Sequence, residues 1–169
     1  MRIFLTGFMG AGKTTVGRHL ARRLELPFAD LDREIEARAG RTVREIFETR
    51  GEPEFRRLEH ESLRELCEWP GLVAATGGGT LTRPANRRLI REAGLSVWLC
   101  PDFATIVERI GGRGKEDRPL FQDETQAWDL YQERLAVYRR CDLKVEVDPR
   151  EGPSEVAGRI ELLVGSEAP

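Results

Sequence analysis

One stretch near the N-terminus, Gly7-Phe-Met-Gly-Ala-Gly12-Lys13-Thr14, sets the architecture expected for this chain of 169 residues. It matches the pattern G-x-x-x-x-G-K-[ST], whose glycines let the backbone curl so that N–H groups face phosphate oxygens. We predict a buried strand before it, over Arg2–Thr6, and an amphipathic helix after it, over Lys13–Leu24. The positive end of that helix faces the same anion. In this pattern the lysine reaches the β- and γ-phosphates and the Thr14 hydroxyl binds Mg²⁺, so the segment predicts nucleotide binding.

Short apolar runs alternate with longer amphipathic ones along the rest of the chain. The further predicted strands are Pro27–Ala29, Leu72–Thr76, Leu95–Cys100 and Asp142–Val147. The further predicted helices are Leu31–Ala39, a short one from Thr42 to Gly51, one from Pro53 through Cys67, Pro84–Ala93, Asp102–Ile110, Thr125–Arg140 and Ser154–Val164. Strands separated by helices predict an α/β fold of three layers, a five-stranded parallel sheet with helices on both faces. Ligands of such sheets bind beyond the carboxyl ends of the strands.

Local signals mark several boundaries within this pattern. Thr42 and Glu45 form a capping-box signature, and Gly51 should end the helix that they begin. In the helix over Thr125–Arg140 we expect Trp128, Leu135 and Tyr138 to contact the core. The last five residues, 165–169, are expected to form a loose tail.

Composition excludes several classes of protein. Lys and Arg number 27 and Asp and Glu 29, a net charge of −2, whereas a dedicated nucleic-acid binder is strongly basic. Hydrophobic residues make up 40% of the chain, which is enough for one core, and the length suits a single domain over 1–169. No run approaches the ~20 apolar residues of a membrane helix, and the N-terminus does not resemble a signal peptide. We therefore expect a cytoplasmic protein without membrane or nucleic-acid partners.

Cysteine and histidine usage argues against two further kinds of site. The three cysteines, Cys67, Cys100 and Cys141, are odd in number and widely spaced, which does not suit a disulfide framework. The chain has two histidines, His19 and His60, and this small number argues against a histidine-based zinc site.

Two features follow strands and therefore belong at the ligand-binding edge of the sheet. Asp30 and Asp32 come just after the second strand, where one carboxylate could face a metal and the other a substrate hydroxyl; plain helix N-capping is the alternative. Gly77, Gly78 and Gly79 follow the third strand and offer bare backbone amides to a ligand, with a flexible turn as the alternative.

Three basic features carry a similar choice. Arg56 and Arg134 lie on predicted helices, where an arginine is normally solvated. The segment Gly111–Asp123 is polar, rich in glycine and contains Arg118, so it is either a linker or a lid that folds cations over phosphates. The guanine-reading motif N-K-x-D of GTPases is absent from the sequence.

Together these motifs resemble shikimate kinase, a small kinase with a phosphate-binding loop. The resemblance runs over nearly the whole chain. Its motifs, in order, are GFMGAGKTTVGRHLA (7–21), FADLDREIE (28–36), GRTVREIFETRGEPEFRRLE (40–59), ATGGGT (75–80), Arg118-Pro119 and RLAVYRR (134–140).

The resemblance implies a nucleoside monophosphate kinase-like fold with a substrate-binding region at about 32–60 and a mobile lid at about 111–123. It implies transfer of the ATP γ-phosphate to the 3-hydroxyl of shikimate, by a protein acting as a monomer in aromatic amino acid biosynthesis. Phosphoryl transfer needs positioning and charge stabilisation rather than a covalent nucleophile. Two arginines suit a substrate carboxylate, and an aspartate suits the hydroxyls.

The resemblance also implies residue roles. ATP would contact Gly10, Ala11, Gly12, Lys13, Thr14, Thr15, Arg118 from the lid and, at its adenine, Arg150 from the last strand-to-helix loop. Mg²⁺ would lie at Thr14 and Asp30. Shikimate would be held by Asp32, Arg56, Gly77, Gly78, Gly79 and Arg134. Catalysis would involve Lys13, Arg118 and Asp32, the last orienting the attacking hydroxyl or accepting its proton.

Two other functions share part of this pattern. Another small kinase, acting on gluconate or a nucleoside monophosphate, would have the same loop and lid; Asp32, Arg56 and the glycine turn favour shikimate. A non-catalytic nucleotide switch would bind ATP or GTP without an acceptor, and the two arginines on the acceptor side count against it.

Overall fold

The computed structural model describes residues 1–111 and 124–167, and its centre is one parallel sheet. The sheet has five strands: β1 (Arg2–Thr6), β2 (Phe28–Asp30), β3 (Leu72–Ala75), β4 (Leu95–Pro101) and β5 (Leu143–Val147). Their order is β2-β3-β1-β4-β5, and every neighbouring pair is parallel. The predicted five-stranded parallel sheet is confirmed. The strand with the phosphate loop therefore lies at its centre.

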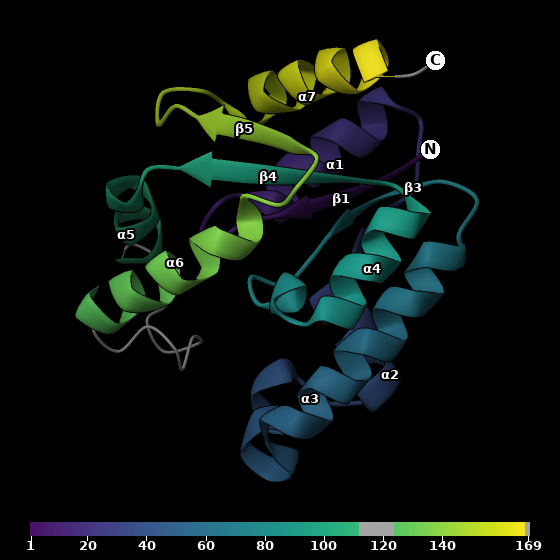
Figure 1. Ribbon diagram of the computed structural model, residues 1–169, viewed down its shortest axis with the longest axis vertical. Coiled ribbons are helices and arrows are strands. Elements are labelled where there is room, and N and C mark those ends of the chain that lie inside the picture. The colour runs from purple at the N-terminus through teal and green to yellow at the C-terminus, as the bar shows by residue number, and fades with distance from the viewer. Residues whose placement is uncertain (112–123, 168–169) are drawn as a thin grey trace.

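Helices cover both faces of the sheet, as predicted (Figure 1). Their bounds are α1 Lys13–Arg23, α2 Leu31–Ala39, α3 Val43–Glu68, α4 Pro84–Ala93, α5 Phe103–Gly111, α6 Glu124–Tyr138 and α7 Pro153–Glu167. Helices α1 and α7 pack on one face, while α3 and α4 pack on the other. Helices α5 and α6 form a third cluster around Phe8 and Trp98.

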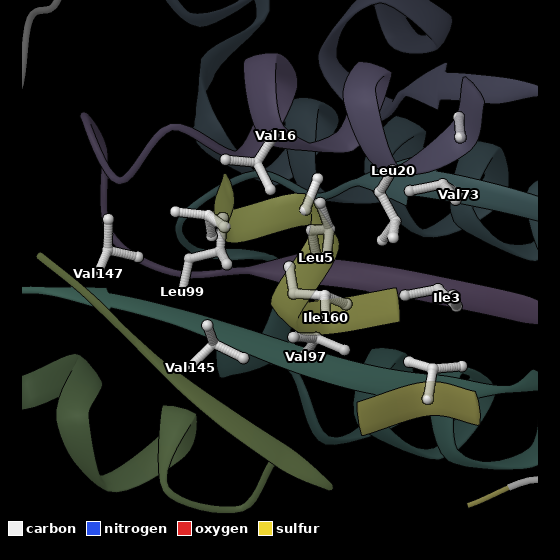
Figure 2. Close-up of a cluster of buried hydrophobic side chains, with 14 of the residues drawn as sticks. Ile3, Leu5, Val16, Leu20, Val73, Val97, Leu99, Val145, Val147 and Ile160 are labelled. Atoms are coloured by element: carbon white, nitrogen blue, oxygen red, sulfur yellow. The ribbon is translucent and has the colours of Figure 1, made fainter. Parts of the chain in front are cut away.

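The alternation of side chains along β1 divides the core between the two faces. Ile3 and Leu5 join Leu20 of α1 and Ile160 of α7 in the cluster of Figure 2. Phe4, between them in the sequence, joins the cluster of α3 and α4 on the opposite face. All three β1 side chains are fully buried, as expected for the central strand of a sheet covered on both sides.

The local boundary signals act as predicted around α3. Thr42 caps the helix, accepting a hydrogen bond from the backbone N–H of Glu45, whose side chain accepts one from the backbone N–H of Thr42. Gly51 interrupts the helix with φ 78° and ψ 171°, a conformation that glycine adopts without strain. The segment is thus two helical pieces joined at a kink.

Two expectations and one omission need correction. Trp128 is 43% exposed, because the inward face of α6 consists of Ala127, Tyr131, Arg134 and Tyr138, while the indole stacks on the outer side of Tyr131. The tail predicted from residue 165 begins later, since α7 continues to Glu167. A short 3₁₀ helix, η1 (Thr80–Thr82), was not predicted; it directly follows the glycine turn.

None of the helices within residues 1–111 and 124–167 combines the length and the apolar character that crossing a membrane requires.

Candidate active site

A cleft of about 1550 Å³ opens where β1, β2 and β3 end. Its walls are the phosphate loop, the start of α2, both pieces of α3 and the turn after β3, with α5, α6 and the β5–α7 connection completing it. The predicted site residues that line it are Gly10, Ala11, Gly12, Lys13, Thr14, Thr15, Asp30, Asp32, Arg56, Gly77, Gly78, Gly79 and Arg134. The fold therefore brings together segments that are as much as 124 positions apart in the sequence (Gly10 to Arg134).

The phosphate loop depends on backbone conformations that favour glycine. Gly7, Gly10 and Gly12 have φ of 141°, 77° and 93°. A Cβ on Gly7 would also lie 2.6 Å from the carbonyl oxygen of Leu99. Lys13 is the first residue of α1, and its Nζ donates hydrogen bonds of 2.9 Å to the carbonyl oxygens of Gly7 and Phe8. The lysine thus lies across the loop, where the phosphates of a nucleotide would be bound.

Asp30 links the loop to α2. Its Oδ2 accepts a 2.7 Å hydrogen bond from Thr14 Oγ1, and its Oδ1 accepts one of 3.2 Å from the backbone N–H of Asp32. Asp30 is therefore the N-cap of α2, as the alternative interpretation held, and it also contacts the loop hydroxyl. Hydroxyl and carboxylate oxygens are ligands that suit a divalent magnesium ion, so these two residues fit the predicted metal site.

Asp32 has the most strongly perturbed carboxylate of the cleft. Its side chain lines the cleft, and its pKa is raised from 3.8 to about 6, chiefly because the surrounding walls desolvate the carboxylate. The negative charges of Asp30, Glu59 and Glu36 contribute to this rise, whereas Lys13 opposes it. A carboxylate with a pKa near 6 is well placed to accept a proton at neutral pH.

Arg56 and Arg134 converge on the glycine turn from two helices. A Cβ on Gly79 would lie 2.8 Å from Nη2 of Arg56 and 3.3 Å from Nη2 of Arg134. Glycine at this position therefore leaves the space in front of both guanidinium groups open. Arg134 is only 6% exposed, and its Nε is buried without a hydrogen-bond partner among the described residues. A buried guanidinium with an unused donor favours an anionic ligand.

A buried carboxylate that the sequence did not reveal supports one of these arginines. Glu59 is 1% exposed; its Oε2 accepts a 2.9 Å hydrogen bond from Nη1 of Arg56, and its Oε1 accepts one of 2.8 Å from Thr80 Oγ1. In the sequence, a glutamate three residues after an arginine in a helix is typical of a solvated ion pair. Only the fold shows that the carboxylate of this pair is buried, with Arg56 partly exposed at the cleft.

The family model described as shikimate kinase matches residues 9–163 of the chain, which contain nearly every element of this cleft. The chain belongs to the shikimate kinase family. The resemblance found in the sequence is thereby confirmed, together with the ATP-dependent kinase activity that it implied.

Relatives and solved structures in the shikimate kinase family match the chain over most of its length. The shikimate kinase of Sulfurihydrogenibium sp. (strain YO3AOP1) is 36% identical over 159 residues, 94% of each chain. That of Pseudomonas fluorescens (strain Pf0-1) is 43% identical over 153 residues, covering 88% of this chain and 87% of the relative. The structure of shikimate kinase from Acinetobacter baumannii in complex with shikimate has a TM-score of 0.92 at 38% identity, covering 98% of this chain and 93% of that one.

Not every residue predicted for this shikimate kinase family site lies in the cleft. Arg150 is exposed, and its neighbours Pro149 and Glu151 line the cleft in its place. Arg109 of α5 was missed: it lines the cleft, and its Nη1 donates a 3.3 Å hydrogen bond to the carbonyl oxygen of Gly10. No motif surrounds Arg109 in the sequence. Arg118 and the predicted lid, from 112 to 123, lie outside the described residues.

Proposed function

We propose that this protein transfers the γ-phosphate of ATP to the 3-hydroxyl of shikimate, giving shikimate 3-phosphate and ADP in aromatic amino acid biosynthesis. The observation that carries the proposal is the convergence of Arg56 and Arg134 on Gly79 in the same cleft as the phosphate loop. Shikimate is an anion with neighbouring hydroxyl groups. Two guanidinium groups suit its carboxylate, and the adjacent Asp32 suits its hydroxyls.

The residues of the cleft divide the work of the reaction. The backbone N–H groups of residues 10–15 and the Nζ of Lys13 would hold the phosphates and neutralise the charge that develops during transfer. Asp32 would orient the attacking hydroxyl and accept its proton, for which a pKa of about 6 is appropriate. Gly78 and Gly79 would leave room for the shikimate carboxylate beside the two arginines.

Thr14 and Asp30 would hold Mg²⁺, Asp30 either directly or through water. The ion would supply positive charge between the phosphates of ATP. Arg118 as a contact to ATP, Arg150 near adenine, the monomeric state and the cytoplasmic location stay predictions from the sequence and the resemblance.

An assay of ADP release with shikimate, gluconate, CMP and AMP as separate acceptors tests the proposal. We expect saturable turnover with shikimate and only background ADP release with the other three. A preference for gluconate or for a nucleoside monophosphate would identify the protein as another small kinase. ADP release that does not depend on any acceptor would contradict the proposal that the cleft binds an acceptor for phosphoryl transfer.

A further inference from the structure

A chain of buried polar groups lies behind the acceptor side of the cleft and connects three helices. Asn86, in the first turn of α4, donates a 2.9 Å hydrogen bond from Nδ2 to the carbonyl oxygen of Thr80 in η1. Its Oδ1 is 2.7 Å from Nδ1 of His60 in α3. Asn86 and Thr80 are both 0% exposed, so the bond between them is sheltered from water, whereas the bond to His60 is partly buried.

The direction of these hydrogen bonds is determined by their partners. Because a carbonyl oxygen only accepts, the Thr80 bond requires the amide nitrogen of Asn86, and this turns the amide oxygen toward His60. The Nδ1 of His60 must therefore carry a hydrogen atom and donate it. The amide of Asn86 thus has one orientation in which it satisfies both Thr80 and His60.

The same network continues to the guanidinium group of Arg56. Thr80 Oγ1 donates to Oε1 of Glu59, and Oε2 of Glu59 accepts from Nη1 of Arg56. A second connection runs from α4 to the same residue, since Nη1 of Arg83 donates a 3.2 Å hydrogen bond to the carbonyl oxygen of Arg56. Asn86 is therefore two side chains away from the arginine that faces the acceptor.

We propose that Asn86 and Thr80 are positioning residues for the acceptor site, which hold Glu59 and thereby orient Arg56 toward the shikimate carboxylate. This rests on the proposed function. Neither residue touches the acceptor itself. Their effect is to keep η1 against α3, so that the guanidinium of Arg56 is already in place when the acceptor arrives and less conformational freedom is lost on binding.

The crowding around the glycine turn explains why small displacements matter here. A Cβ on Gly77 would lie 3.1 Å from Thr80 Oγ1, 3.3 Å from Glu59 Oε1 and 3.4 Å from Asp32 Oδ1. The hydroxyl of Thr80 and two carboxylates thus meet at one point of the backbone. Arg56 is oriented by one hydrogen bond to Glu59 and two to Glu52. If Thr80 no longer holds Glu59, the bond from Glu59 fixes the guanidinium less tightly and Glu52 remains its other anchor.

The first test compares two replacements of Thr80, one that removes the hydroxyl group and one that keeps it. Thr80→Val keeps the shape and loses the hydroxyl, whereas Thr80→Ser keeps the hydroxyl and loses a methyl group. We expect Thr80→Val to raise the Kd and KM for shikimate about tenfold, the scale of one lost hydrogen bond to a charged group. The KM for ATP should change less than about twofold, and Thr80→Ser should bind shikimate as the unmodified protein does.

The second test replaces Asn86 and includes a matched control. Asn86→Ala should raise the Kd for shikimate about fivefold, and in combination with Thr80→Val the two effects should not add, because both act through Glu59. Ser96→Ala is the control, because Ser96 is buried and hydrogen-bonded to Asp142 outside the cleft. This variant should lose stability without losing affinity for shikimate. Urea unfolding of all variants separates stability from affinity.

The outcomes distinguish this inference from the proposed function. If the unmodified protein phosphorylates shikimate but Thr80→Val and Asn86→Ala bind it no worse than Ser96→Ala, the positioning role is wrong and the proposed function stands. An equal rise in the KM for ATP and for shikimate would also contradict it. If the unmodified protein does not use shikimate, the proposed function fails, and the inference fails with it.

Discussion

The nucleotide side and the acceptor side of the cleft are built in different ways. The nucleotide side is built around one continuous loop, residues 7–14, which would hold phosphates mainly through its backbone N–H groups and whose shape depends on the positive φ of its glycines. The acceptor side is made of charged side chains from α2, α3 and α6 around the turn after β3. The first is a local conformation, and the second exists only when the whole fold is formed.

This difference determines what each side requires of its residues. On the nucleotide side a glycine is needed because its backbone conformation is strained for other residues, as for Gly10 and Gly12. Gly79 has φ −103°, which any residue adopts, and it is needed because a side chain would occupy the space in front of two guanidinium groups. Charges on the acceptor side must also be balanced: Arg56 has Glu59, whereas the buried Nε of Arg134 has no hydrogen-bond partner among the described residues.

The largest effect is expected on the nucleotide side. Lys13→Ala should lower kcat by roughly 10³-fold or more, because it removes the positive charge nearest the transferred phosphoryl group. Circular dichroism should show an unchanged fold, since the two Nζ hydrogen bonds that the variant loses are to carbonyl oxygens of the lysine's own loop. Near-normal ADP release by the purified variant would show that the phosphate loop does not take part in the reaction as proposed.

Asp32→Asn is the next largest expected effect and tests where the proton goes. The amide is nearly isosteric but cannot accept a proton, so turnover should fall about 10²–10⁴-fold while ATP binding is retained. For the unmodified protein, kcat/KM for shikimate should fall as the pH drops below about 6, the raised pKa of Asp32. If the substitution instead weakened ATP binding alone, Asp32 would belong to the metal side and the roles of Asp30 and Asp32 would be exchanged.

The raised pKa of Asp32 also predicts that protein stability decreases with rising pH, whereas activity increases. The pKa of Asp32 lies above its ordinary value of 3.8, so between pH 3.8 and about 6 the folded state binds more protons than the unfolded state. The stability of the unmodified protein therefore decreases as the pH rises through this window, whereas Asp32→Asn lacks that contribution. Thermal melts at pH 4 and pH 8 should show the variant gaining stability relative to the unmodified protein at the higher pH.

The contrast between the two sides also explains how far the sequence was informative. The loop could be predicted in detail because its residues are consecutive and each has a local physical reason. Asp32 was a candidate because of its place after the second strand, with helix capping as the alternative. The roles of Arg56 and Arg134 came only from the family resemblance, since by residue type alone each suited a solvated helix face. Glu59, Thr80 and Asn86 were missed, because their importance comes from burial between α3, η1 and α4, which no local pattern encodes.

The two arginines provide a direct comparison within the acceptor side. Arg56→Ala and Arg134→Ala should each weaken shikimate binding on the order of 10²-fold, with little change for ATP. Because both face Gly79 and, on the proposed function, would bind one carboxylate, the double variant should lose less than the product of the single effects. Calorimetric titration of the four proteins with shikimate measures this. Strict additivity would mean that the arginines bind different parts of the acceptor.

Stability should separate the same two arginines. Arg56→Ala leaves Glu59 buried without its cationic partner, so the free energy of unfolding should fall by about 2 kcal/mol, a typical value for a lost hydrogen bond to a charged group. Arg134→Ala removes a guanidinium that has an unused buried donor, so its loss should be smaller. An equal loss in urea unfolding would mean that the Glu59 pair contributes no more to stability than the contacts of Arg134.

The smallest expected effects lie at the outer end of the nucleotide side, where sequence and structure favour different arginines. Arg109 lines the cleft and contacts the carbonyl oxygen of Gly10, whereas Arg150 is exposed. Arg150 donates a 2.8 Å hydrogen bond from its backbone N–H to Oδ1 of Asp148, and this bond does not depend on the side chain.

We therefore expect Arg109→Ala to raise the KM for ATP about tenfold, since it removes a cation from the wall beside the phosphate loop. Arg150→Ala should raise this KM less than about twofold, as is typical for the loss of a charge on the protein surface. Steady-state kinetics at saturating shikimate measures both. A larger effect for Arg150 would restore the role that the sequence suggested and would mean that the β5–α7 connection changes shape when ATP binds.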